Sequence, residues 1–295
     1  MSTALSLLRD CVRRALVEDL GREDLCLQAD VTGRLSVPPA LLGLATTRAK
    51  ATGVLAGMEC AREAFQILAP AIVYKPIRRD GDLLRPHDVV FTAQGPMQAL
   101  LVAERTALNF LQRLSGIATL TRAFVDAVAG TKAKIFDTRK TTPGLRILEK
   151  QAVLAGGGQN HRIGLYDQVL LKENHFESAL PMSYEQVVSR CVQGQSAPVV
   201  AEARTVDEAI AAVRGGALVI LLDNFAPGEL LATAVRRVRA MAEQLGATVQ
   251  LEASGGVRLD NVRAFAESGV DRISIGALTH SAQALDLSML VETFQ

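Results

Sequence analysis

Tryptophan is absent from the 295 residues and aromatic residues make up only 4% of them, although 49% are hydrophobic. A core built mainly from Leu, Val, Ile and Ala favours layered α/β packing. No apolar run reaches the ~18 residues that suggest a membrane span. The first residues lack the apolar core of a signal peptide, because Arg9, Asp10, Arg13 and Arg14 interrupt it. We therefore expect a cytoplasmic protein with no membrane partner.

Cysteine and net charge are also scarce. The four cysteines, at positions 11, 26, 60 and 191, show neither CxxC spacing nor the density of a disulfide scaffold, which fits a reducing compartment. A net charge of +1 argues against a nucleic-acid partner, which requires a large basic excess. Between Lys134 and Glu173, however, seven Lys or Arg face only four acidic residues. Local positive charge is therefore concentrated in one segment.

The first part of the chain has the pattern of a small α+β domain. Residues 5–20 carry apolar side chains at helical spacing. Short β-prone runs separated by Gly and Pro follow, at 42–47, 54–56, 71–75 and 89–92, and predict an antiparallel sheet. Residues 98–128 predict two consecutive helices with a break near Gly116. We place one domain at 1–116 and a second at 117–295, with a C-terminal helix that packs back on the first.

The second part alternates between strands and helices, which predicts a parallel sheet. The predicted strands are 134–137, 168–172, 198–203, 218–223, 248–253 and 272–275. Such a series either closes into a barrel or forms an open doubly wound sheet. Each predicted strand ends in polar or turn-forming residues, and a barrel gathers all strand ends around one pocket, whereas an open sheet concentrates its site at one switch point. The fold class is therefore α/β, with an N-terminal α+β domain followed by an incomplete, TIM-like α/β barrel.

The densest chemical signal lies in residues 137–175. Five side chains in this segment form a candidate anion site: Arg139, Lys140, His161, Arg162 and Lys172. Arg matches a carboxylate with a planar fork, and Lys acts as a compact charge. The alternative is a solvated basic face. We expect His161 to be a neutral hydrogen-bonding group, because neighbouring cations disfavour its protonation; His175 and His280 are interpreted as structural.

Two acids and two glycine-containing loops complete the candidate site. Glu202 and Asp223 end successive strands and suit Mg²⁺ and ribose hydroxyls, because Mg²⁺ prefers one or two carboxylates plus water and phosphate oxygens. Alternatively, they neutralise the basic cluster. The motifs EASGGV (252–257) and SIGALTHS (274–281) follow the last two strands, where barrels bind phosphate. Their candidate residues are Ser254, Gly255, Gly256 and Gly276.

Several segments together resemble the quinolinate phosphoribosyltransferase family. They are ERTALNFLQRLSGIAT (104–119), DTRKTTPGLR (137–146), GGGQNHRIGLYD (156–167), LLKENH (170–175), LLDNF (221–225), EASGGV and GVDRISIGALTHS (269–281). The resemblance runs from about residue 5 to the end. It implies a type II phosphoribosyltransferase fold and the transfer of phosphoribose from phosphoribosyl pyrophosphate to quinolinate, with decarboxylation to nicotinate mononucleotide, in NAD biosynthesis. It also implies Mg²⁺ as cofactor and a homodimer, with a hexamer as the alternative.

The resemblance assigns roles to individual residues. Thr138, Arg139, His161, Arg162 and Lys172 would bind substrate, and Arg105 would reach the partner subunit's active site. Ser254, Gly255, Gly256 and Gly276 would contact phosphate. Glu202 and Asp223 would hold Mg²⁺ directly or through water, and together with Lys140 they are the catalytic candidates.

The sequence departs from the family pattern at two positions. Val200 stands where an E-x-E pair often begins, so only Glu202 of that pair is present, and Gln151 stands where Tyr is common. The alternatives are a related molybdate-associated protein, a transferase that acts on nicotinate, and a non-catalytic phosphate-binding barrel. The triplet Asn160, His161 and Arg162 favours the quinolinate enzyme.

Overall fold

The computed structural model describes residues 3–194 and 197–293 and divides the chain into two compact units. Unit 1 comprises residues up to Arg122, together with Thr141–Gly157 and the C-terminal segment from Leu278; unit 2 comprises Ala123–Lys140 and Gly158–Ala277. Position 116, where we placed the domain boundary, lies inside a helix of unit 1. No helix in the described part of the chain is long and apolar enough to cross a membrane.

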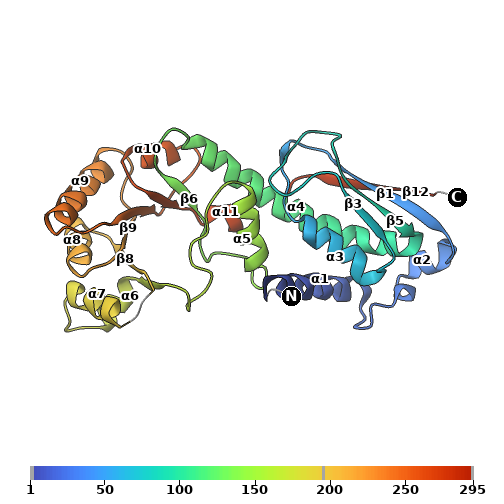
Figure 1. Cartoon of the computed structure of the whole chain (residues 1–295), viewed down its shortest axis with the longest axis horizontal. Helices are drawn as coiled ribbons and strands as arrows, with labels where there is room; N and C mark the ends of the chain where they lie inside the picture. Colours follow the sequence, from blue (N-terminus) through green and yellow to red (C-terminus); the bar gives the residue numbers. More distant parts are fainter. Residues whose placement is uncertain (1–2, 195–196, 294–295) are drawn as a thin grey trace. The chain divides into compact units, whose positions relative to one another are not determined.

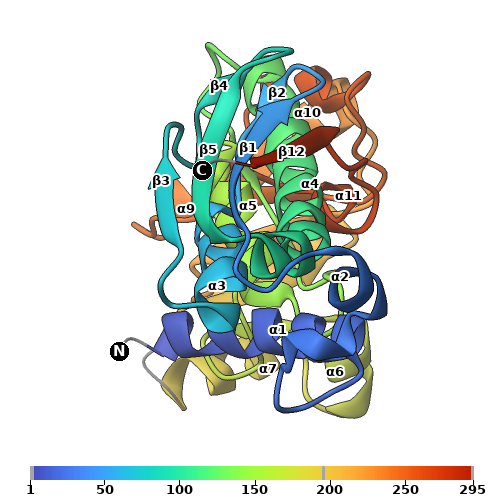
Figure 2. The same cartoon turned by 90° about the vertical axis from the view of Figure 1, so that its right-hand side faces the viewer.

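Unit 1 is built on an antiparallel sheet in the order β12-β1-β5-β3, which confirms the predicted sheet (Figures 1 and 2). Its elements are α1 Thr3–Leu20, a 3-10 helix Leu27–Ala29, α2 Val31–Ser36, β1 Leu42–Ala49, β2 Gly53–Val54, α3 Met58–Leu68, β3 Val73–Pro76, β4 Leu83–Leu84, β5 Val89–Pro96, α5 Arg146–Ala155 and β12 Leu287–Thr293. The aromatic rings of Phe65, Tyr74 and Phe91 pack together in its core, with Tyr74 and Phe91 centroids 4.7 Å apart.

The expected C-terminal helix is wrong. The last element is strand β12, which pairs with β1 from Gly43 opposite Thr293 to Ala49 opposite Leu287 (Figure 2). Along β12, Leu287, Met289 and Val291 are buried or half-buried and alternate with exposed residues, and a period of two is that of a strand. The segment still returns to the N-terminal sheet, as a strand that extends it.

The predicted break near Gly116 is also wrong. A single helix, α4, runs from Met97 to Ala127. A Cβ atom at Gly116 would lie 2.0 Å from the carbonyl oxygen of Gln283 and 3.1 Å from Cα of Ala284. Gly116 therefore lets another backbone segment of unit 1 approach the helix, and close approach rather than chain reversal explains the glycine.

Unit 2 is a six-stranded parallel sheet in the order β6-β11-β10-β9-β8-β7. Its strands lie within two residues of the predicted bounds, at β6 Lys134–Phe136, β7 Val169–Leu171, β8 Val199–Ala203, β9 Val219–Asp223, β10 Gln250–Ser254 and β11 Arg272–Ser274. The helices are α6 Glu173–Ser178, α7 Tyr184–Gln193, α8 Val206–Arg214, α9 Glu229–Gln244 and α10 Val262–Glu267, with the short α11 Ala277–His280 crossing into unit 1.

The strand order distinguishes the two predicted closures. From β7 to β11 each strand lies beside the next one along the chain, so the sheet has no reversal of strand order and is not doubly wound. In the described residues β6 and β7 stand at the two ends of the sheet without pairing to each other, which is the incomplete barrel that we predicted. Figure 1 shows α7, α8 and α9 in a row beside the strands.

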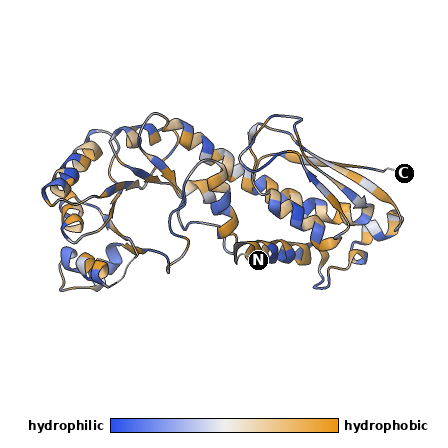
Figure 3. Ribbon diagram, viewed as in Figure 1, coloured by the Kyte–Doolittle hydropathy of each residue, from blue (hydrophilic) through white to orange (hydrophobic). Residues whose placement is uncertain are grey.

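The helices of unit 2 are amphipathic, and their ends are defined by local sequence. Helix α9 buries one face, formed by Leu231, Ala234, Val235, Val238 and Ala242, and exposes Arg236 and Arg237. Figure 3 shows hydrophilic and hydrophobic residues interspersed along this helix. The hydroxyl of Ser183 caps α7 by accepting from the backbone N–H of Gln186, and that of Thr205 caps α8 in the same way. These caps fix where α7 and α8 begin, and the second of them ends the loop after β8.

Candidate active site

All six strands of unit 2 run in the same direction, so their carboxyl ends meet at one edge of the sheet. The structure brings the predicted unit 2 residues to this edge: Thr138, Arg139 and Lys140 after β6, Lys172 after β7, Glu202 and Asp223 at the ends of β8 and β9, Ser254, Gly255 and Gly256 at the end of β10, and Gly276 after β11. His161 and Arg162 lie in the loop that leads into β7.

Arg139 and Arg162 are neighbouring cations of like charge. Burial lowers the pKa of Arg162, and the charge of Arg139 lowers it further, while Asp167 opposes both effects. The Asp167 carboxylate accepts hydrogen bonds from the backbone N–H groups of Ile163 and Gly164, at 2.7 and 3.1 Å, and so closes the turn after Arg162. Two guanidinium groups that repel each other are stabilised when an anion binds between them.

Lys172 and Glu202 lie on adjacent strand ends. Nζ of Lys172 is 3.6 Å from Oε2 of Glu202, and the lysine side chain is 54% exposed whereas the glutamate is 12% exposed. The hydroxyl of Tyr184 donates to the backbone oxygen of Glu202 at 2.6 Å and fixes the end of β8. Glu202 thus has a rigid backbone and a cationic neighbour that a negatively charged ligand would share.

Asp223 is held by its neighbours on β9 and β10. Its Oδ1 accepts from the hydroxyl of Ser254 at 3.1 Å, and its Oδ2 accepts from the amide of Asn224 at 2.7 Å. Gly255 has a φ of +93°, and a Cβ there would lie 2.1 Å from Oδ1 of Asn224. The glycine is therefore required by the Asp223–Asn224 turn as well as by any phosphate.

Lys140 and the small residues occupy the loops at the same edge. Lys140 is exposed, and its backbone N–H donates to the hydroxyl of Thr138 at 3.0 Å, which shapes the turn after β6. Gly256 has a φ of +63°, and its oxygen accepts from the side chain of Asn261 at 3.0 Å. Gly276 is half-buried after β11.

His161 is buried, with 8% of its surface exposed. Its Nδ1 accepts from the backbone N–H of Arg162 at 2.8 Å, which leaves the ring proton of a neutral imidazole on Nε2. Its backbone N–H donates to Oδ1 of the buried Asp137 at 2.8 Å, and Nε2 lies 3.4 Å from Oε1 of Glu252. His161 therefore belongs to a buried network as well as to the cationic segment.

Sequence reasoning missed Asp137 and Glu252, both of which are fully buried. The available signal was an acidic residue next to apolar strand residues: Glu252 lies between Leu251 and Ala253, and Asp137 directly follows Phe136. Charged residues are almost never fully buried unless they are paired. An acid within a central strand therefore indicates a partner on a neighbouring strand or loop.

The two departures from the family pattern have clear surroundings. Val200 is fully buried in an apolar cluster with Val219 and Leu221, against which Leu170 packs. At position 200, where the family pattern often has a glutamate, this chain therefore has an apolar side chain that packs in the core. Gln151 is exposed on α5 in unit 1.

Arg105 lies on α4 in unit 1, where its side chain is exposed. It lines a cavity of about 320 Å³ together with Glu18, Asp19, Asn109 and Arg113. Arg105 forms no ion pair with any residue that the structure describes, so the salt bridge that an arginine on an apolar helix would suggest is not made.

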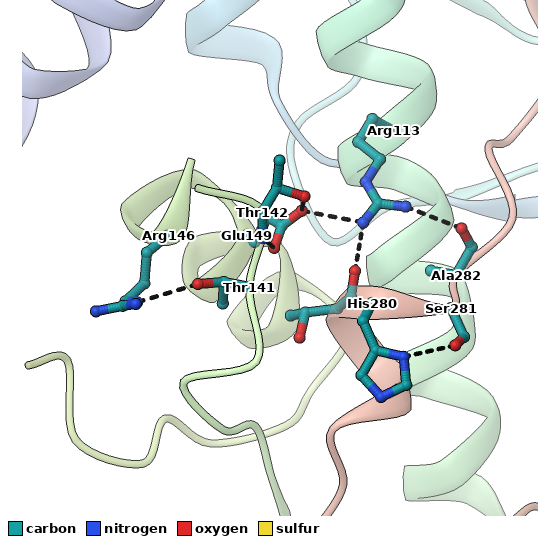
Figure 4. A network of polar contacts seen from close by, with 9 residues as sticks. Arg113, Thr141, Thr142, Arg146, Glu149, His280, Ser281 and Ala282 are labelled. Carbon is teal, nitrogen blue, oxygen red and sulfur yellow. Dashed lines mark hydrogen bonds and ion pairs between the residues drawn. The ribbon is translucent and has the colours of Figure 1, made fainter. Parts of the chain in front are cut away.

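A second buried network lies in unit 1 (Figure 4). The fully buried carboxylate of Glu149 accepts from the backbone N–H and the hydroxyl of Thr142, at 3.0 and 2.7 Å, and from the guanidinium of Arg113 at 3.0 Å. Arg113 also donates to the backbone oxygens of Thr279 and Ala282. His280 bonds to the hydroxyl of Ser281 at its surface, and Nδ1 of His175 in unit 2 accepts from the backbone of Lys172, so both histidines make local structural contacts.

The donor set at the sheet edge suits a hard cation. Glu202 and Asp223 offer carboxylate oxygens, and no cluster of three or more His, Cys, Asp or Glu side chains able to hold a metal occurs in the described ranges. Carboxylate oxygens are the protein ligands that Mg²⁺ takes together with water and phosphate oxygens.

Fold and edge together define an incomplete α/β barrel whose strand ends carry several cationic side chains beside two carboxylates. Models of the quinolinate phosphoribosyl transferase N-terminal and C-terminal domains match residues 30–115 and 117–290. The chain therefore belongs to the quinolinate phosphoribosyltransferase family.

Individual relatives agree. The chain is 39% identical to a probable nicotinate-nucleotide pyrophosphorylase (carboxylating) of Bacillus subtilis, with 96% of this chain and 92% of that protein covered. It is 39% identical to the nicotinate-nucleotide pyrophosphorylase (carboxylating) of Mycobacterium leprae, over 95% and 96% of the two chains. The solved structure of the Francisella tularensis nicotinate-nucleotide pyrophosphorylase matches with a TM-score of 0.88 at 35% identity, covering 98% and 97% of the two chains.

Proposed function

We propose that this chain transfers phosphoribose from phosphoribosyl pyrophosphate to the nitrogen of quinolinate and releases pyrophosphate and carbon dioxide. The observation that carries the proposal is the juxtaposition of Arg139 and Arg162, whose like charges a dicarboxylate would neutralise. Nicotinate has one carboxylate and would leave part of this cluster unmatched.

The residues at the sheet edge divide the work. Arg139, Arg162 and Lys172 bind and orient the dicarboxylate, with Thr138 and His161 completing the acceptor site. Ser254, Gly255, Gly256 and Gly276 hold phosphate through the loops after β10 and β11. Lys140, Glu202 and Asp223 surround the reacting carbon, where the two carboxylates stabilise positive charge as the sugar approaches an oxocarbenium ion.

Glu202 and Asp223 would also hold Mg²⁺, directly or through water, and this ion would draw charge onto the departing pyrophosphate. The bond from the ring nitrogen to the anomeric carbon forms as the bond to pyrophosphate breaks. The cationic ring then stabilises the carbanion left when carbon dioxide departs, and that carbon takes up a proton. Catalysis of this kind relies on positioning and charge matching, so it requires no protein nucleophile.

The test is an incubation with quinolinate, phosphoribosyl pyrophosphate and Mg²⁺, with nicotinate as the matched acceptor. We expect nicotinate mononucleotide, pyrophosphate and carbon dioxide in equal amounts from quinolinate, and no product without Mg²⁺. Nucleotide formed from nicotinate without carbon dioxide would favour the rival transferase. Binding of phosphoribosyl pyrophosphate without product from either acceptor would favour a non-catalytic barrel.

We further propose a homodimer in which Arg105 completes the partner's site; its exposed guanidinium, which has no ionic partner in the described chain, supports this role. The Arg105→Ala chain and the Lys140→Ala chain, each inactive alone, should recover activity when they are unfolded, mixed and refolded together. In a mixed dimer, one active site then has an intact Lys140 from one subunit and an intact Arg105 from the other. Absence of activity in the mixture would contradict the shared site. Sedimentation distinguishes a dimer from a hexamer.

Cytoplasmic location is proposed on the state of the cysteines. All four lie in the described chain and are free thiols, and burial raises the pKa of Cys60 well above its ordinary value. Such thiols persist in a reducing compartment. Localisation of a tagged chain in cell fractions would check this.

A further inference from the structure

Glu252 is a fully buried carboxylate in the middle of the parallel sheet of unit 2. Its Oε1 lies 3.4 Å from Nε2 of His161 and accepts a hydrogen bond from the hydroxyl of Ser274. Its Oε2 lies 3.2 Å from Nε of Arg272, whose guanidinium stacks 4.0 Å above the ring of Phe136. Every group that faces Glu252 in these contacts is therefore a donor or a cation.

The carboxylate is ionised in the folded protein. Burial raises the pKa of Glu252, but the hydrogen bond from His161, the charge of Arg272 and the hydrogen bond from Ser274 outweigh burial and bring the pKa below its ordinary value. Removing a charge from water costs several kcal/mol even after relaxation. A hydrophobic residue would fill this position at lower cost, so packing alone does not explain Glu252.

His161 connects Glu252 to the two arms that carry the arginines. One arm is the exit of β6, where Asp137 accepts from the backbone N–H of His161 at 2.8 Å and precedes Arg139 by two residues. The other arm is the loop in which His161 is bonded directly to Arg162, whose backbone N–H donates to Nδ1 of His161 at 2.8 Å. The ring of His161 is thus held on Nδ1 by its own loop and on Nε2 by Glu252.

The two arms need such a tie because their guanidinium groups repel. The charge of Arg139 lowers the pKa of Arg162, and Asp167 opposes this effect. Without a fixed point between the arms, the arginines would separate and the acceptor would have to draw them together on binding, at a cost in affinity.

We propose that Glu252 is a positioning residue for the acceptor site: by fixing the neutral, Nε2-protonated ring of His161, it holds Arg139 and Arg162 at the spacing that binds the dicarboxylate. The inference rests on the proposed function for the identity of the ligand. Outer contacts that orient a histidine and its tautomer act in the same way around metal sites. Glu252 does not touch the substrate and is not a catalytic residue.

The test variant is the double substitution Glu252→Met with Arg272→Met, which removes the buried ion pair as a unit and keeps its volume. Replacing a buried pair by packed hydrophobic residues is often neutral for stability, whereas removing one member strands a charge. The matched control is Asp271→Asn. Asp271 lies at the amino ends of β10 and β11, away from the strand ends that carry the site. Its carboxylate accepts a hydrogen bond from the backbone N–H of Leu251 and pairs with Arg239 at 2.8 Å.

We expect the double variant to raise the quinolinate KM by about tenfold or more, with the phosphoribosyl pyrophosphate KM and kcat retained. The control should retain both KM values. Nitrogen NMR of the four histidines, with His161→Asn to assign the signal, should show a fixed Nε2–H tautomer in the unaltered protein and a mixture of the two tautomers in the double variant. An unchanged quinolinate KM alongside an altered His161 signal would overturn the proposal and leave Glu252 a structural residue.

Two further measurements keep the proposal open to refutation. If the double variant does not fold, Glu252→Gln takes its place, because the glutamine keeps an oxygen that can accept a hydrogen bond from His161. The quinolinate KM of this variant should rise, but by less than that expected for the double variant. An unchanged quinolinate KM together with a shifted His161 signal would overturn the proposal. If the unaltered protein makes no nucleotide, the proposed function fails, and calorimetric binding of pyridine-2,3-dicarboxylate to the same variants still tests the positioning role.

Discussion

Glu149 in unit 1 and Glu252 in unit 2 are both fully buried, and both accept from a hydroxyl and lie beside an arginine. Their remaining partners differ. Glu149 receives the backbone N–H of Thr142, so it ties one chain segment to another. Glu252 faces the ring of His161, a predicted ligand-binding side chain. The same buried chemistry therefore stabilises the backbone in one unit and orients a site in the other.

Charge is balanced differently as well. In unit 1 two buried acids meet cations, since Arg9 lies 2.8 Å from Glu63 and Arg113 lies 3.0 Å from Glu149. At the sheet edge of unit 2, Arg139 stands beside Arg162. The buried acids of unit 1 are paired without a ligand, whereas the like charges of Arg139 and Arg162 would be stabilised by a bound anion. Substitutions should therefore change stability in the first case and affinity in the second.

The largest effect is expected from Glu149→Ala. It leaves the N–H of Thr142 without its acceptor and Arg113 without its carboxylate, and breaking a buried pair on one side costs about 3 kcal/mol of unfolding free energy. Urea unfolding measures it. The exposed Glu229, which pairs with Arg236, is the control and should show no resolvable shift of midpoint when changed to Ala. Equal midpoints for Glu149→Ala and the unaltered protein would remove the distinction between the units.

Arg162→Ala should reverse the pattern. Loss of a charge-assisted contact to the acceptor, about 1.5–3 kcal/mol, raises the quinolinate KM about tenfold to hundredfold. Stability should fall by no more than about 1 kcal/mol, because relief of the repulsion from Arg139 offsets the lost hydrogen bond to the backbone oxygen of Gln168. Steady-state kinetics with each substrate varied, together with urea unfolding, provide the comparison. Normal KM and turnover would refute the role of Arg162 in acceptor binding.

The sequence predicted the site edge better than the units' interiors. Strand ends such as Lys172, Glu202 and Asp223 could be placed because parallel strands bring their carboxyl ends together whatever the details of packing. Glu252 and Glu149 could not be interpreted from spacing, because their partners come from distant segments and pairing across the fold has no period in the sequence. The roles of the edge residues toward substrate and Mg²⁺ stay predictions.

Two errors in unit 1 have a common cause. Gly116 was interpreted as a helix break from its low helix propensity, and the C-terminal strand β12 was expected to be a helix. In both places tertiary contacts override local preference. The backbone at Gln283 lies so close to α4 that position 116 has no room for a side chain, and the C-terminal segment forms a strand because it pairs with β1. Neither partner is adjacent in sequence, so local propensity could not reveal them.

Gly116→Ala tests that explanation by the sign of its effect. Within an ordinary helix the change stabilises by about 1 kcal/mol. Here the added Cβ would lie 2.0 Å from the backbone oxygen of Gln283, and overpacking of this kind costs about 1–3 kcal/mol. Thermal unfolding should therefore show a lower Tm. Gly194→Ala is the control, because Gly194 is exposed with a φ of −80° and should tolerate alanine; a higher Tm for Gly116→Ala would contradict the close approach.

The smallest effect is expected from Asp271→Asn, at the amino ends of the unit 2 strands. This substitution tests whether only the carboxyl ends of those strands affect quinolinate binding. Burial raises the pKa of Asp271, but the hydrogen bond from Leu251 and the cations Lys132 and Arg239 more than offset it, so the pKa lies below its ordinary value of 3.8. A carboxyl group with a lowered folded-state pKa contributes stability above its unfolded pKa and loses it as the pH falls through the folded one. Asp271→Asn should therefore destabilise by about 1 kcal/mol at neutral pH, since solvent screens this partly exposed group. The difference in unfolding free energy between this variant and the unaltered protein should become smaller below pH 3.8. Urea unfolding midpoints measured from neutral pH to below pH 3.8 give this difference. An unchanged quinolinate KM in Asp271→Asn would show that only the carboxyl ends of the strands affect affinity. A raised KM would show that both ends of the strands affect the site.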